Sequence, residues 1–139
     1  MQTHALPYLN FAGEAREALE FYKSCFGGET QIMPIGGSPM EGQFPAEKHG
    51  HVLHGQLNAG AFVVMASDMT PGPLQAGNNF GIVVACATED ECRGYWEKLS
   101  AGGHIYDPLG MKFWGALSGT CTDRFGVRWM VGWDPKTAQ

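Results

Sequence analysis

The sequence predicts an α+β fold made of two tandem βαβββ modules, whose strands form a curled mixed sheet around a cleft. Two observations predict it. Strand-like and helix-like segments follow one another in the same order in residues 4–68 and 79–134, and similar landmarks recur in both ranges. A repeated pattern of this kind is typical of a duplicated supersecondary unit. We therefore expect one domain over residues 1–139, with a linker rich in proline and glycine over residues 69–78.

The bulk composition narrows the class of protein. A length of 139 residues favours a single domain. With 44% hydrophobic and 17% charged residues, the chain is unlike a disordered protein. Its net charge of −5 argues against nucleic-acid binding. No apolar run approaches the roughly 18 residues of a membrane helix, and no secretion signal is recognised at the start. We expect a cytoplasmic protein that binds neither nucleic acid nor membranes.

The first module is expected to contain one helix and four strands. Apolar residues at helical spacing predict a helix over residues 14–26, with one stripe formed by Ala15, Ala18, Leu19, Tyr22 and Phe26. Gly27-Gly28 ends that helix. The long loop over residues 36–50 is a candidate flap. Strands are expected over residues 5–12, 29–35, 51–58 and 61–67.

The second module repeats this order. Thr88 is a candidate N-cap and Glu91 completes a capping box, which predicts a helix over residues 88–101. Strands are expected over residues 79–87, 104–109, 114–122 and 127–133. The landmarks shared by the two modules are Phe21-Tyr22 with Tyr95-Trp96, Gly27-Gly28 with Gly102-Gly103, and Gly60–Met65 with Gly126–Val131. The last of these pairs Val64 with Met130.

Several short motifs are spread over nearly the whole chain. They are Tyr8–Phe11, Ala18–Tyr22, Phe26–Gly28, His54, Met65–Asp68, Gly77–Phe80, Phe113–Gly115, Thr122–Gly126 and Trp129. With these motifs the sequence resembles the vicinal oxygen chelate superfamily, which has the glyoxalase, bleomycin-resistance and dihydroxybiphenyl dioxygenase fold, and within it the PhnB-like proteins.

PhnB-like proteins often carry the label 3-demethylubiquinone 3-methyltransferase. The chain has nothing like the glycine-rich strand–turn–helix that a classical methyltransferase uses for its nucleotide cofactor. It is also short for such an enzyme. We therefore do not expect methyl transfer.

The resemblance also implies where a divalent metal would lie. Metal-dependent members use His, Glu or Gln on the first and fourth strands of each module. Carried over, these positions are Pro7, Val64, Phe80 and Met130. A shift of register by one residue substitutes Tyr8 and Met65, or Asn79 and Trp129. Neither set provides the hard ligands that such an ion requires, so we expect no cofactor.

A histidine cluster leaves a second route to metal open. His49 and His51 would share one face of a strand and His54 the other, so at most two would act together. Structural roles for these histidines are favoured over metal binding.

His54 and Asp68 are the candidate catalytic pair, because a histidine beside a carboxylate can transfer protons near neutral pH. A turn role for Asp68 and a core hydrogen bond for His54 are the favoured alternatives. Asp123 opens the turn over residues 123–126, and a structural role in that turn is likewise favoured.

Aromatic and apolar residues predict a small-molecule pocket formed by Tyr8, Phe80, Trp114, Trp129 and Met130. We expect a metal-independent protein that binds a small apolar or aromatic molecule. The alternatives are a glyoxalase-like lyase or isomerase, acting on a small oxygenated substrate with His54 and Asp68, and an interaction module with a vestigial pocket.

The resemblance implies a homodimer. We expect all four cysteines to be buried thiols: Cys25, Cys86, Cys92 and Cys121.

Overall fold

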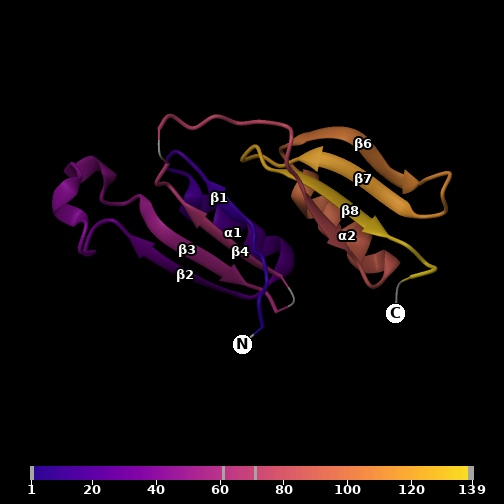
Figure 1. Ribbon diagram of the computed structural model, residues 1–139. Coiled ribbons are helices and arrows are strands. Elements are labelled where there is room, and N and C mark those ends of the chain that lie inside the picture. Colours follow the sequence, from indigo (N-terminus) through magenta and orange to yellow (C-terminus); the bar gives the residue numbers. More distant parts are fainter. Residues whose placement is uncertain (1, 61, 71, 138–139) are drawn as a thin grey trace. The chain divides into compact units, whose positions relative to one another are not determined.

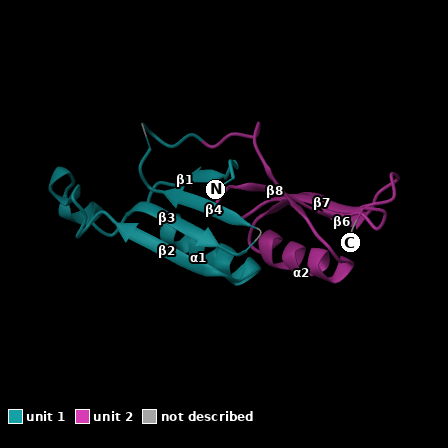
Figure 2. Cartoon of the chain, turned by 60° about the horizontal axis from the view of Figure 1, so that its bottom comes forward, with its two compact units in different colours: residues 1–75 teal, residues 76–139 magenta. Residues whose placement is uncertain are grey.

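The computed structural model describes residues 2–60, 62–70 and 72–137. The chain divides into two compact units between Gln75 and Ala76, inside the expected linker (Figure 2). In the described part of the chain, each unit has one α-helix and one four-stranded mixed sheet in the order βαβββ (Figure 1). The predicted α+β fold and module order are confirmed, although neither sheet is strongly curled. Within the described part of the chain, every helix is too short or too polar to cross a membrane.

Unit 1, residues 1–75, has the sheet order β1-β4-β3-β2, in which β1 is parallel to β4 and the other neighbours are antiparallel. The apolar stripe of α1 is buried against the sheet, where Leu57 and Val64 are fully buried. Phe26, expected in that stripe, is only half-buried. The elements are β1 (Tyr8–Asn10), α1 (Ala15–Phe26), β2 (Glu29–Pro34), η1 (Glu41–Gln43), η2 (Ala46–Lys48), β3 (Val52–Asn58) and β4 (Val63–Ser67).

Unit 2, residues 76–139, has the order β5-β8-β7-β6, with β5 parallel to β8. Thr88 is confirmed as the N-cap, because its hydroxyl accepts from the Glu91 amide at 3.1 Å. The Glu91 carboxylate accepts from the Ala87 amide at 3.2 Å, one residue before the amide that a capping box would use. The elements are β5 (Ile82–Ala85), α2 (Glu89–Ser100), β6 (His104–Met111), β7 (Leu117–Thr122) and β8 (Arg128–Trp133).

Some expected strands are shorter than the sequence predicts. Phe80 precedes β5 rather than lying in it. Trp114 lies in a tight turn before β7, because the Lys112 amide donates to the Ala116 carbonyl and Gly115 has a φ of +90°. His49 and His51 both precede β3, so the expected alternation of the histidines along one strand is wrong.

The strand pairing matches β4 with β8 one residue away from the expected match of Gly60–Met65 with Gly126–Val131. β1 pairs Tyr8 with Met65, and β5 pairs Val83 with Met130. Met65 is therefore the counterpart of Met130, and the expected pairing of Val64 with Met130 is wrong. The reason is turn length: residues 59–62 join β3 to β4, whereas residues 123–127 join β7 to β8, one residue more. Aligning the turn glycines therefore misplaces the strand that follows.

Each sheet has one face covered by its helix and one that we call its open face. Alternation along a strand assigns side chains to the two faces. In unit 1 the open face carries Tyr8, His54, Gln56 and Met65, in register across β1, β4 and β3. In unit 2 it carries Val83, Thr120, Arg128 and Met130, across β5, β8 and β7. The open faces are where side chains remain available for binding.

Candidate functional site

A hollow of about 350 Å³ lies on the open face of unit 2. Its floor is apolar, because Val83 pairs with Met130 across β5 and β8. Phe80 adds an aromatic ring from the segment before β5. Phe80 and Val83 are each 63% exposed and Met130 is 43% exposed, so the apolar surface is accessible to a ligand. The lining residues are Asn78, Asn79, Phe80, Gly81, Ile82, Val83, Thr120, Arg128, Trp129 and Met130.

One charged side chain lines this hollow. Arg128 is half-buried at the start of β8. Its guanidinium donates a hydrogen bond to the Asn78 carbonyl and lies 5.7 Å from the centre of the Tyr106 ring. Thr120 faces the same hollow from β7 and supplies a hydroxyl. The hollow thus combines an apolar floor with few polar groups, which is the usual composition of a small-molecule site.

A second hollow of about 210 Å³ shares Val83 and Met130 with the first. Trp114, 55% exposed, lines it from the turn between β6 and β7 and packs edge-on against Phe113, with ring centres 4.9 Å apart. Val83 and Met130 therefore border both hollows.

The five expected pocket residues fall in three places. Phe80 and Met130 lie together in the larger hollow, and Trp114 lies in the smaller one. Trp129 borders the larger hollow, but its side chain is fully buried and its indole Nε1 donates to Asp123 Oδ2 at 2.8 Å. Tyr8 belongs to unit 1, where its ring centre is 6.1 Å from that of His54. Sequence reasoning missed Arg128, which gave no signal beyond its place in an alternating strand.

Asp68 is engaged in backbone hydrogen bonds. Its Oδ1 accepts from the amides of Gly13 at 2.8 Å and Ala15 at 3.0 Å, and its Oδ2 accepts from the Val52 amide at 2.8 Å. A carboxylate at the start of α1 also interacts favourably with the helix dipole. These contacts tie β1, α1 and β3 together. Among the described residues no hydrogen bond joins His54 to Asp68, so the contacts support the structural role for Asp68.

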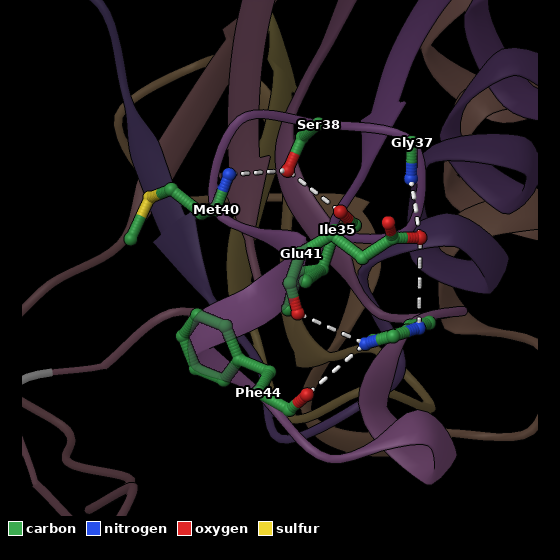
Figure 3. Close-up of polar contacts among 7 residues, drawn as sticks. Ile35, Gly37, Ser38, Met40, Glu41 and Phe44 are labelled. Atoms are coloured by element: carbon green, nitrogen blue, oxygen red, sulfur yellow. Dashed lines mark hydrogen bonds and ion pairs between the residues drawn. The ribbon is translucent and has the colours of Figure 1, made fainter.

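Polar contacts around Glu41 and Phe44 hold the expected flap together (Figure 3), and His49 is the partner of both residues. Its Nε2 donates to the carbonyls of Glu41 at 3.1 Å and Phe44 at 3.0 Å, and its Nδ1 lies 3.8 Å from the Glu41 carboxylate. The same carboxylate accepts from the Gly37 amide at 3.1 Å. The loop over residues 36–50 therefore has internal structure, including η1 and η2, and His49 serves that structure.

The positions implied for a metal do not fit one. The open-face pairs on the first and fourth strands are Tyr8 with Met65 and Val83 with Met130. A phenol, two thioethers and an aliphatic side chain do not make a site for a hard divalent cation. Within the described residues, no three or more His, Cys, Asp or Glu side chains are grouped to hold an ion.

All four cysteines are buried thiols, and none forms a disulfide. Burial raises the pKa of Cys86 to about 12, and the neighbouring Cys92 thiol and Glu91 carboxylate add to the effect. Burial also raises the pKa of Cys121 to about 11, with a contribution from Asp123. Because thiolate is the reactive form, these thiols are inert near neutral pH.

The raised thiol pKa values predict a loss of stability in alkali. A folded-state pKa above the ordinary value of 9.0 means that folding favours the neutral thiol. This contribution is complete below pH 9.0 and is lost as the pH rises toward 11 and 12. Urea unfolding across that range should show a steeper decline for the wild type than for a C86A/C121A variant. Equal slopes would contradict the prediction.

Comparisons with known proteins agree with this architecture. Residues 3–132 match the protein family described as 3-demethylubiquinone-9 3-methyltransferase. The chain is 28% identical over 134 residues to protein YjdN of Escherichia coli (strain K12), covering 90% of this chain and 91% of that protein. The crystal structure of protein PA1353 from Pseudomonas aeruginosa is 36% identical, with a TM-score of 0.85, and the match covers 96% of this chain and 98% of that one.

Other solved structures extend the likeness. A putative 3-demethylubiquinone-9 3-methyltransferase, PhnB protein, from Bacillus cereus is 26% identical with a TM-score of 0.75, covering 94% and 99% of the two chains. The fosfomycin resistance protein FosX from Listeria monocytogenes is 12% identical with a TM-score of 0.64, covering 96% and 93%. A glyoxalase-related enzyme from Fulvimarina pelagi is 18% identical with a TM-score of 0.61, covering 97% and 90%. The last two share the fold of this chain.

Proposed function

Since the chain belongs to the PhnB-like family described as 3-demethylubiquinone-9 3-methyltransferase, we propose that it binds a small apolar or aromatic molecule on the open face of unit 2. The observation that carries the proposal is the accessible apolar floor formed by Phe80, Val83 and Met130. Covering apolar surface stabilises a complex by about 25 cal/mol per Å², and this floor offers three large side chains side by side. The proposed site needs no metal.

The backbone around the proposed site supports binding through side chains. The pairing of β5 with β8 and of β8 with β7 occupies the main-chain groups of β8 and those of β5 and β7 that face it. Methyl transfer is not part of the proposal, because neither strand–helix turn has a glycine-rich phosphate cradle. At the start of α1, the amides of Gly13 and Ala15 already bind the Asp68 carboxylate.

The proposal can be tested by introducing a charged side chain into the apolar floor of the hollow. N-phenyl-1-naphthylamine, a neutral aromatic dye that brightens on leaving water, should bind the wild type saturably. M130E should weaken this binding at least about tenfold, because the new carboxylate would have to lose water against an apolar ligand. M111E is the matched control, since Met111 is exposed on β6 and lines neither hollow. Absence of binding to the wild type, or equal binding to M130E, would refute the proposal.

A second candidate is a glyoxalase-like lyase or isomerase acting on a small oxygenated substrate. It rests on His54, a half-buried imidazole beside Tyr8 on the open face of unit 1. In this version His54 transfers the proton and Asp68 keeps its place at the start of α1. Assays with methylglyoxal and glutathione, with and without added nickel or zinc, should show turnover that H54Q abolishes. Inactivity under all conditions would remove this candidate.

We also propose a homodimer in the cytoplasm. β1 and β5 are edge strands of their sheets, and edges of this kind are usually covered. Light scattering should give a mass near twice 15.1 kDa. A mass near that of one chain would overturn the proposal.

A further inference from the structure

We propose that the larger hollow of unit 2 selects a ligand with one anionic group, such as a small aromatic carboxylate or sulfonate, and that Arg128 is the residue that selects it. This inference rests on the proposed function and deepens it by naming the charge of the ligand.

The position of Arg128 is fixed by the sheet. It begins β8, two residues before Met130, so both side chains are on the open face. Its neighbour across the β5 edge is Gly81, where an added Cβ would lie 3.7 Å from the Arg128 Cβ. Because Gly81 has no side chain, the stem of Arg128 is not crowded on that side. Arg128 lines the same hollow as the apolar floor.

The guanidinium is oriented but keeps most of its donors. One nitrogen donates to the Asn78 carbonyl, and the Tyr106 ring lies on one side at 5.7 Å. A guanidinium has five N–H donors, so a ligand still finds a fork that suits a planar anion. Holding the group in advance lowers the cost of ordering it when the ligand binds.

Arg128 forms no ion pair with an acidic side chain among the described residues. The ion pairs found there are His49–Glu41, Arg93–Glu89 and Lys112–Asp107. The described residues that line the hollow include no carboxylate. A cationic ligand would therefore be repelled by the Arg128 guanidinium, and none of these lining residues offers it a negative charge. An anion would gain a charge-assisted hydrogen bond beside an apolar wall, where the local dielectric constant is lower than in water.

Two dyes with one aromatic skeleton test the inference. 1-Anilinonaphthalene-8-sulfonate carries the anion, and N-phenyl-1-naphthylamine is its neutral counterpart. R128Q should weaken binding of the sulfonate at least about tenfold and change binding of the neutral dye less than about twofold. Added salt should weaken sulfonate binding to the wild type more than to R128Q. The matched control is R124Q, which removes one charge from an exposed arginine that does not line the hollow.

The outcomes separate the two proposals. If the neutral dye binds the wild type but R128Q leaves the sulfonate affinity unchanged, the inference is overturned and the proposed function stands. If R128Q weakens both dyes alike, or R124Q has the same effect as R128Q, selection by Arg128 is also overturned. If neither dye binds the wild type, the proposed function itself fails. Cooperative thermal unfolding of each variant, followed by circular dichroism, confirms that it is folded.

Discussion

Replacement of Gly103 by alanine should lower the free energy of unfolding by about 3 kcal/mol or more. An added Cβ would collide with the Thr122 carbonyl oxygen and would lie 3.0 Å from the Asp123 carbonyl carbon and Cα. All three atoms belong to the backbone at the end of β7, so none can rotate away as a side chain would. The turn after α2 would have to separate from β7. Urea unfolding followed by circular dichroism measures the loss.

Gly28→Ala should have a comparable effect in unit 1. Its added Cβ would collide with the Asn58 carbonyl oxygen and the Ala59 Cα. The first glycine of each pair is the control. An alanine at Gly27 meets no atom within 4 Å, and one at Gly102 meets only the flexible Arg124 side chain. Both positions have positive φ, so these variants should lose only about 1 kcal/mol. Equal losses at the two glycines of a pair would contradict the explanation.

The paired glycines show what the sequence could and could not predict. Their position after each helix predicted where the helix ends, because a local pattern decides helix termination. The close approach of the second glycine to a strand carbonyl involves residues distant in sequence, Asn58 and Thr122. That relation repeats in both units and is stronger support for duplication than the glycine pattern itself. Only the folded chain reveals it.

The order of elements was predictable for the same local reason. The apolar stripe of α1 and the N-cap of α2 each depend on residues that are close together in the sequence. Strand register does not, because a one-residue difference in turn length moves every following side chain to the other face. Met65, rather than Val64, therefore shares the open face with Tyr8. Arg128 could not be predicted as a binding residue for a similar reason. Its guanidinium is oriented by Asn78 and Tyr106, which are distant from it in the sequence.

Replacement of Asp123 by alanine should cost about 4 kcal/mol of unfolding free energy. The side chain is 3% exposed. Its Oδ1 accepts from the amides of Phe125 at 2.8 Å and Val127 at 3.1 Å, and its Oδ2 accepts from the Trp129 indole at 2.8 Å. Alanine would leave three donors without this acceptor, one of them on a fully buried tryptophan. Urea unfolding followed by tryptophan fluorescence and circular dichroism checks the value.

Two further variants separate the turn from the core. Asp134 accepts one bond in an exposed turn, from the Lys136 amide at 2.9 Å, so D134A should cost less than about 1 kcal/mol. W129F removes the indole N–H but leaves the turn bonds of Asp123 intact, and D123A should therefore cost more in the wild type than in W129F. A double-mutant cycle measures this coupling. A coupling near zero would mean that Asp123 serves only its turn. A positive one would mean that it also holds Trp129 beneath the floor of the proposed binding site.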